Sequence, residues 1–393
     1  MDTVSTPRIA SRVGRLTGGR LFGLVEEARD HRTIDLALGV PVAPPHPPDV
    51  IGSACTVLRS DLHNQYANPS GNEQLRAQLA RLSPTPTDPE TELTVTVGAT
   101  EALYLAVQAA VDPGEEVVVF EPFYDNFLSA VALAGGVPRL VPLSPPDWRY
   151  DPERLRAAFN HQTRAVIVST PNNPTGHMIG AGEWAEIADL CQRWNAVVIS
   201  DEIYSAYAFD GHCHISAAEI PALRDRSFVV GSLSKSHSVA GWRIGFLRAA
   251  PALTAAARRI HVAVCAGTAA PLQEAVARVA AAHPDFTRAG DDLLAQRDRA
   301  IEVFDHVGLR CMAPDGGCYV MADISPFTDA DSEAFAGRLL RDAQVFVAPG
   351  RYFHPEGSGL GDTFVRIAFN RPSAWFDAVE SRLHGLRPHT ARA

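Results

Sequence analysis

Residues 227–248 read SFVVGSLSKSHSVAGWRIGFLR and join an apolar strand pattern to Lys235. The run Ser227–Ser232 predicts a buried strand that ends just before this lysine. In open α/β sheets, ligands bind at the ends of the strands. We therefore expect Lys235 to lie at the ligand-binding edge of such a sheet.

Lys235 is also the single lysine of the chain, although lysine and arginine together number 35 among 393 residues. Arginine can replace a surface lysine at little cost, but it cannot lose its proton to bond covalently to an aldehyde. The lone lysine is therefore either a leftover surface residue or a covalent nucleophile. Two serines and an arginine close by, Ser232, Ser234 and Arg243, favour the second interpretation, because hydroxyls and a guanidinium suit an anion.

The middle of the chain alternates strand and helix patterns, which is typical of a mainly parallel sheet covered on both faces. The strand patterns are Leu93–Val97, Glu116–Phe120, Arg164–Ser169, Ala196–Ser200 and Ser227–Ser232, with a further one within Gly241–Arg248. The helical patterns between them are Glu101–Val111, Tyr124–Ala134 and Glu183–Trp194.

The pattern changes from about Asp285 onward. A long helix is predicted at Asp291–Val307, followed by strands at Cys318–Ala322, Val345–Ala348 and Phe364–Phe369. Near the other end, the five prolines of Val40–Pro48 indicate an extended linker. We predict a large domain over residues 46–285, and a small α+β domain formed by residues 1–45 and 286–393.

Composition excludes several classes of protein. With 46% apolar and 20% charged residues, the chain is not disordered, and its net charge of −10 argues against a nucleic-acid partner. No apolar run reaches the ~18 residues of a membrane span, and the first 16 residues lack the apolar segment of a signal peptide. Six dispersed cysteines favour a reduced, cytoplasmic protein. No metal is expected, since His212-Cys213-His214 has no further ligand nearby in sequence.

Three other predicted strands also end in polar residues. Asp201 follows one of them, where it either caps a helix or pairs with a pyridinium nitrogen. Asn172–Gly176 follows another, as a turn that also supplies amides. Gly98–Thr100 opens a helix whose first N–H groups can bind an anion. Each signal is weak alone, but together they predict one site at one edge of the sheet.

These residues carry a resemblance that covers nearly the whole chain. The SxSKxxxxxGxRxG block at Ser232–Gly245, with Asn172–Gly176 and Asp201–Tyr204, resembles the pyridoxal-phosphate aminotransferases of fold type I, class I/II. The nearest group is that of the kynurenine and methionine aminotransferases, to which the segments Asn64–Ala67, Thr96–Tyr104 and Glu121–Asp125 point. The resemblance implies a mainly parallel, seven-stranded sheet between helices, beside a smaller α+β domain.

The resemblance also implies a role for each cofactor residue. Lys235 would carry pyridoxal 5'-phosphate as a Schiff base and then move the substrate's proton, and Asp201 would pair with the ring nitrogen. Asn173 and Tyr204 would hydrogen-bond the phenolic oxygen of the ring, and Tyr124 would stack on its face. The phosphate would be held by Ala99, Thr100, Ser232, Ser234 and Arg243. Tyr66 would reach the phosphate of a neighbouring subunit, which implies a homodimer with shared sites.

At the substrate end, the resemblance implies that Arg366 clamps the α-carboxylate. The loop over the substrate side chain keeps Gly39 and Pro41, but Leu38 replaces the usual glutamine and Val40 the usual aromatic residue. We therefore expect a wider and more apolar pocket here, which favours a bulky substrate.

The resemblance leads to an expected activity, which is transfer of an amino group from an L-amino acid or an amino-acid conjugate to a 2-oxo acid. One alternative is a C–S β-lyase with the same cofactor, and a related one is decarboxylative or oxidative tailoring of a cysteine S-conjugate. The altered loop around Leu38 leaves both open. A non-catalytic regulator that retains the cofactor is disfavoured, because no helix-turn-helix signal precedes the linker.

Overall fold

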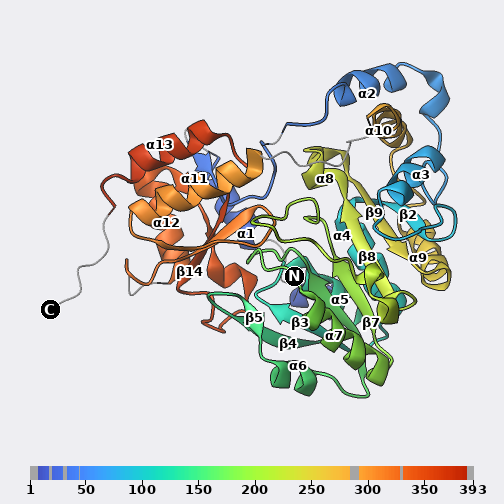
Figure 1. Cartoon of the computed structure of the whole chain (residues 1–393), viewed down its shortest axis with the longest axis horizontal. Helices are drawn as coiled ribbons and strands as arrows, with labels where there is room; N and C mark the ends of the chain where they lie inside the picture. The colour runs from blue at the N-terminus through green and yellow to red at the C-terminus, as the bar shows by residue number, and fades with distance from the viewer. Residues whose placement is uncertain are drawn as a thin grey trace, which may run out of the picture.

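The computed structural model describes residues 8–16, 20–29, 33–43, 45–283, 292–327 and 331–386. Its largest element is a sheet of eight strands, seen with its covering helices in Figure 1. In spatial order the strands are β2 (Leu93–Val97), β9 (Ile244–Ala249), β8 (Ser227–Ser232), β7 (Val197–Asp201), β6 (Thr163–Ser169), β3 (Glu116–Glu121), β4 (Val137–Ser144) and β5 (Arg149–Tyr150).

The strands β8, β7, β6, β3 and β4 run parallel, whereas β9 is antiparallel to both of its neighbours. The seven longer strands match the number that the family resemblance implies. The eighth, β5, has two residues and pairs antiparallel with the end of β4. The prediction of a mainly parallel α/β sheet is confirmed.

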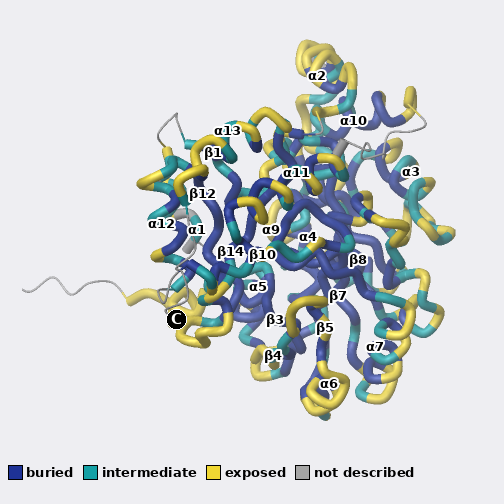
Figure 2. The backbone as a smooth tube through the Cα atoms, turned by 60° about the vertical axis from the view of Figure 1, so that its left-hand side comes forward, coloured by how far each residue is buried: buried dark blue, intermediate teal, exposed yellow. Residues whose placement is uncertain are grey.

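Helices cover both faces of this sheet, which explains why its strands are apolar throughout. Along β3, Val117 and Val119 join one buried cluster with the helix α4 (Gly98–Ala110). The alternate residues Val118 and Phe120 join another cluster with α7 (Ala181–Trp194). Figure 2 shows the result, with the central strands in dark blue and the outer α6 (Pro152–Ala158) largely exposed.

The remaining helices surround these layers. The α-helices are α1 (Arg20–Glu27), α2 (Val50–Leu58), α3 (Glu73–Arg81), α5 (Asn126–Ala134), α8 (Leu233–Ser236), α9 (Pro251–Val264) and α10 (Ala270–Ala282). The short 3-10 helices are η1 (Ser11–Arg15), η2 (Asp61–His63), η3 (Ala217–Glu219), η4 (Pro221–Leu223), η5 (Ala240–Trp242) and η6 (Gly350–Phe353). Within the described ranges, none of the helices is both long and apolar enough to cross a bilayer.

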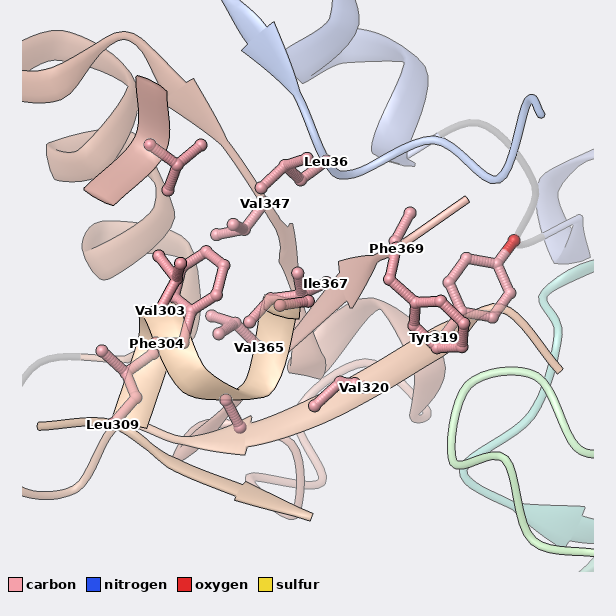
Figure 3. Close-up of a cluster of buried hydrophobic side chains, with 14 of the residues drawn as sticks. Leu36, Val303, Phe304, Leu309, Tyr319, Val320, Val347, Val365, Ile367 and Phe369 are labelled. Atoms are coloured by element: carbon pink, nitrogen blue, oxygen red, sulfur yellow. The ribbon is translucent and has the colours of Figure 1, made fainter. Parts of the chain in front are cut away.

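A second, antiparallel sheet has the order β10 (Arg310–Met312), β11 (Tyr319–Asp323), β14 (Phe364–Ala368) and β13 (Ala348–Pro349). The helices that accompany it are α11 (Asp292–His306), α12 (Ser332–Ala343) and α13 (Ser373–Leu383). Figure 3 shows its core, where Val303 and Phe304 of α11 pack against Val365 and Ile367 of β14.

The N-terminal part of the chain joins this second sheet region through β1 (Ile34–Asp35), which pairs in parallel with β12 (Val345–Phe346). The single strand expected at Val345–Ala348 is therefore wrong in detail. The chain changes partners at Val347, since β12 pairs with β1 while β13 pairs with β14.

Helix α4 also begins earlier than the expected Glu101, at Gly98. Gly98 has a φ of 70°, a conformation that glycine adopts without strain. The chain therefore turns from β2 into α4 without an intervening loop, which brings the first turn of the helix to the end of the sheet.

A buried histidine links the two sheet regions. His177, in the segment between β6 and α7, has its Nε2 3.0 Å from Glu183 Oε1 and its Nδ1 3.4 Å from Asp315 Oδ2. Asp315 lies between β10 and β11, in the second sheet region. Burial alone would lower the pKa of His177, but the two carboxylates outweigh it and raise this pKa. Burial would likewise raise the pKa of Glu183, yet the imidazole lowers it.

We predict that His177→Gln lowers the free energy of unfolding by about 1.5–3 kcal/mol, the scale of hydrogen bonds to charged groups. A raised histidine pKa stabilises the fold below the unfolded value of 6.5 and loses that effect as pH rises. A lowered carboxyl pKa stabilises it above 4.5 and loses that effect as pH falls. Urea unfolding should therefore show the largest difference from wild type between these two values.

The matched control is His161→Gln, because His161 is exposed. This variant should unfold like the wild type at every pH. A deficit in His177→Gln that stays constant from acid to alkaline pH would contradict the charge-based explanation.

Candidate active site

A cavity of ≈ 790 Å³ lies where the two sheet regions meet. All of the site residues expected from the sequence line this cavity, with the exception of Tyr66. Tyr66 lies outside the cavity and is 95% exposed. The lining residues among those expected are Leu38, Gly39, Val40, Ala99, Thr100, Tyr124, Asn173, Asp201, Tyr204, Ser232, Ser234, Lys235, Arg243 and Arg366.

The register of the parallel strands brings several of these residues together. Asp201, the last residue of β7, pairs with Ser169 at the end of β6 and with Val230 near the end of β8. Asn173 follows β6 by four residues, and Lys235 follows β8 by three. The carboxyl ends of three neighbouring strands thus supply an amide, a carboxylate and an amine to one edge.

Lys235 lies in the short helix α8, which Ser232 caps by accepting a hydrogen bond from the Ser234 amide at 3.0 Å. Its Nζ donates to the carbonyl of Gly39 at 2.8 Å, so it points across the cavity toward the N-terminal loop. Burial lowers the pKa of Lys235, and nearby arginines lower it further. A lysine that loses its proton easily is suited to nucleophilic and base chemistry.

The Asp201 carboxylate is buried and accepts one long hydrogen bond, 3.4 Å from the Ile203 amide. Burial raises its pKa to about 7, and the neighbouring Glu202 adds to the effect. A carboxylate in this position requires a positive partner to remain ionised.

An anion cradle lies at the start of α4. The backbones approach so closely here that a Cβ on Gly245 would lie 2.3 Å from the Gly98 carbonyl carbon. A Cβ on Gly98 would lie 2.3 Å from Arg243 Nη2, so the guanidinium covers the first turn of the helix. The hydroxyls of Ser232 and Ser234 are 2.8 Å apart beside it. Helix N–H groups, hydroxyls and a guanidinium form a typical phosphate site.

Arg366, on β14, lines the same cavity from the second sheet. Its Nη1 donates to Asn173 Oδ1 at 2.7 Å and its Nη2 to the Ala37 carbonyl at 2.5 Å. The guanidinium carbon lies 4.0 Å from the ring centre of Tyr319 and 4.5 Å from that of Phe353. Its Nε is buried without a hydrogen-bond partner in the described part of the chain. A rigid, desolvated guanidinium is well prepared to bind a carboxylate.

Tyr319 is a site residue that sequence reasoning missed. Its hydroxyl is 3.0 Å from that of Tyr204, while its ring face supports Arg366. A Cβ on Gly39 would lie 1.7 Å from the Tyr319 hydroxyl, so only glycine fits at that point of the loop. The sequence pattern predicted only that Tyr319 belongs to the strand Cys318–Ala322. The signal that could have identified it is register, since Tyr319 is diagonal to Arg366 on the neighbouring strand.

The loop with Leu38, Gly39 and Val40 is held by Arg371. This buried guanidinium donates to the carbonyls of Asp35 and Val40, each at 2.7 Å, and also to that of Leu38. The loop backbone is therefore fixed against the second sheet. The Val40 side chain remains 51% exposed, so it borders the cavity without closing it.

Comparison with known proteins agrees with this geometry. The family model described as "Aminotransferase class I and II" matches residues 34–379. The chain is 30% identical to kynurenine–oxoglutarate transaminase 3 of Homo sapiens, over 94% of this chain and 88% of that protein. It is 31% identical to the methionine aminotransferase of Escherichia coli, over 91% of this chain and 93% of that protein.

Among solved structures, the chain is similar to N-succinyldiaminopimelate aminotransferase from Mycobacterium tuberculosis. The TM-score is 0.90 and the sequence identity is 32%, and the match covers 96% of this chain and 100% of that chain. Together with the family match over residues 34–379, this similarity identifies the chain as a member of the class I and II aminotransferase family, with the fold-type-I architecture.

Proposed function

We propose that this aminotransferase uses pyridoxal 5'-phosphate to move the amino group of a bulky L-amino acid to a 2-oxo acid. The observation that carries the proposal is the single cavity that joins the chain's one lysine to a buried carboxylate, an anion cradle and a desolvated arginine. Each of these four groups matches one part of the cofactor or of the substrate.

The donor set fits the cofactor. Asp201 would face the ring nitrogen, because a buried carboxylate with a raised pKa of about 7 is stabilised by a cation. Tyr124 would stack on the ring, and Asn173 and Tyr204 would bind its phenolic oxygen. The phosphate would lie against the first turn of α4, between Arg243 and the hydroxyls of the strand end. When bound, the cofactor supplies an electron sink for the bond that breaks at the substrate Cα.

The chain's own residues would then orient the substrate and move its proton. Arg366 would bind the α-carboxylate and fix which bond at Cα stands over the ring. The Lys235 amine would take the Cα proton, because burial lowers its pKa and favours the neutral base. Burial raises the pKa of Tyr204, so its hydroxyl stays protonated as a donor.

We predict that borohydride reduction of the holoenzyme attaches the cofactor to Lys235 alone. Peptide mapping by mass spectrometry should find the label on that residue. Lys235→Ala should show no label and no transamination, yet retain non-covalent cofactor because the phosphate cradle is intact. A label on the N-terminal amine only would contradict the assignment.

Product analysis distinguishes transamination from C–S lyase activity, since a C–S lyase would release pyruvate and ammonia from a cysteine S-conjugate.

We predict that Arg366→Lys lowers kcat/KM by about 10–150-fold, which corresponds to about 1.5–3 kcal/mol for a charged hydrogen bond. Lysine keeps the charge but loses the planar fork, so the change should appear mainly in KM. Steady-state kinetics with one amino acid and a saturating 2-oxo acid would measure it.

Two variants of Tyr319 serve as matched controls. Tyr319→Phe keeps the ring face under Arg366, so KM should stay near wild type. Tyr319→Leu removes that face, so KM should rise as in Arg366→Lys. An unchanged KM in Arg366→Lys would show that the carboxylate binds elsewhere.

The side-chain end of the cavity supports a bulky donor without a second carboxylate. Five charged residues of the described chain line the cavity, and they are Asp125, Asp201, Lys235, Arg243 and Arg366. Both arginines are already assigned, Arg243 to the phosphate and Arg366 to the α-carboxylate. Asp125 is acidic and would repel an acidic substrate side chain. The other walls are mostly apolar, formed by Leu16, Leu21, Leu38, Val40, Leu103, Leu133 and Phe353.

We predict that kcat/KM is about tenfold or more higher for phenylalanine or leucine than for alanine or aspartate. Val40→Phe should narrow the cavity and reduce this ratio. Val42→Phe is the control, because Val42 is similarly exposed at 47% but does not line the cavity. A clear preference of the wild type for alanine or aspartate would refute the substrate class.

We also propose a homodimer with shared sites. The segment around α2 and η2 exposes Ile51, Leu58, Leu62 and Tyr66, and a second copy of the chain would cover these apolar side chains. That packing would place Tyr66 at the phosphate of the partner.

We further propose that residues 46–285 form the large domain and that residues 1–45 and 286–393 form the small one. We also propose a cytoplasmic location, which is supported by six cysteines without disulfides.

A further inference from the structure

Three metal-ligating side chains meet outside the residues assigned above. Glu101 lies in the first turn of α4, His261 in the last turn of α9, and Cys265 directly after α9. His261 Nδ1 is 2.9 Å from Glu101 Oε1, and Cys265 Sγ is 3.0 Å from the same oxygen. Cys265 Sγ and His261 Nδ1 are 3.5 Å apart. Among the residues described, this is the one group of three or more such ligands that converges so closely.

The local structure holds the three ligands in place. His261 and Cys265 are four residues apart at the end of a helix, a spacing that puts both on one face. His261 is fully buried, and Glu101 is buried except for 9% of its surface. The second carboxylate oxygen of Glu101 accepts a hydrogen bond from the Val97 amide at 2.6 Å, which leaves Oε1 directed at the other two side chains.

The spacing of the three donor atoms is close to that of a tetrahedral zinc site. Zinc binds nitrogen at ~2.0–2.1 Å, oxygen at ~2.0–2.2 Å and thiolate sulfur at ~2.3 Å, so neighbouring ligand atoms are roughly 3.3–3.6 Å apart. The sulfur–nitrogen distance of 3.5 Å already fits. The two distances to Glu101 Oε1 are hydrogen-bond lengths, so this oxygen would withdraw by about half an ångström.

A fourth position is open to a neighbouring cavity of ≈ 550 Å³. Glu101 and Cys265 both line it, with Tyr104, Ser129 and Arg243 among the other lining residues. A water molecule or an external ligand could complete the coordination from this side. Three protein ligands with one open position is the arrangement of an accessible zinc site rather than of a closed structural one.

We propose that Glu101, His261 and Cys265 bind one zinc ion, or another thiophilic divalent cation, per chain. The mixed nitrogen, sulfur and oxygen set favours zinc over magnesium or calcium, which prefer oxygen ligands alone. On binding, the Cys265 thiol loses its proton to the solvent and the sulfur bonds to the metal. This proposal differs from the expectation of no metal, which considered His212-Cys213-His214 and not residues 160 positions apart in sequence.

The test uses cobalt(II) as a spectroscopic probe in the purified, tag-free, full-length protein with its cofactor retained. After treatment with a chelator, loading with cobalt and then dialysis, we expect one metal per chain by elemental analysis. Four-coordinate cobalt with a thiolate ligand should give intense visible bands and a sulfur-to-cobalt charge-transfer band. Zinc should displace the cobalt and abolish both signals.

Cys265→Ser should abolish the charge-transfer band and weaken binding on the order of 10–100-fold or more. Cys55→Ser is the matched control, because Cys55 is an exposed thiol on α2. It should retain full binding. His261→Gln tests the second ligand, and its circular dichroism would report whether it folds.

Substoichiometric metal in the wild type, or an unchanged spectrum in Cys265→Ser, would overturn the proposal. In that case the three residues would form a hydrogen-bonded cluster and nothing more. The result is independent of the proposed transamination, because none of the three ligands is assigned to the cofactor or to the substrate.

Discussion

The parallel register of β6, β7 and β8 is the constraint on which the site depends. It aligns Ser169, Asp201 and Val230 across three neighbouring strands, so the residues that follow emerge at one edge. Both faces of these strands are covered by helices, which makes a shift in register costly because it would expose apolar side chains on each face. The positions of Asp201, Asn173 and Lys235 relative to one another are therefore fixed by the core rather than by contacts within the cavity.

The other half of the site depends on the second sheet and on the segment that precedes the proline-rich linker. Arg366 and Tyr319 come from adjacent strands, while Arg371 holds the loop that carries Gly39. The Gly39 carbonyl in turn accepts a hydrogen bond from Lys235 Nζ, and Arg366 Nη1 donates one to Asn173 Oδ1, so hydrogen bonds join the two halves of the site across the cavity. A shift of the second sheet would move Arg366 and the loop together, because the same sheet region supports both.

The sequence was sufficient to predict the large sheet and the residues at its strand ends, because both follow from local patterns. The strand Leu93–Val97 and the strand Ser227–Ser232 have the predicted bounds. The split of Val345–Ala348 between two partners could not be predicted, since it depends on pairing with distant strands. Tyr319 was missed for the same reason: its importance arises from contacts with Gly39 and Arg366, which only the tertiary structure brings near.

Two adjacent carboxylates at the end of β7 show how the fold gives similar groups different properties. Glu202 receives hydrogen bonds from Ser200 and the Ala217 amide and faces His214, so its pKa is lowered although burial would raise it. Asp201, on the cavity side, has no comparable support, and burial raises its pKa to about 7. The side chains and the amide around Glu202 thus keep its carboxylate ionised, whereas Asp201 requires a further positive charge in the cavity to remain ionised. On the proposed assignment, the same desolvation that raises the pKa of Asp201 would strengthen its pairing with a protonated ring nitrogen.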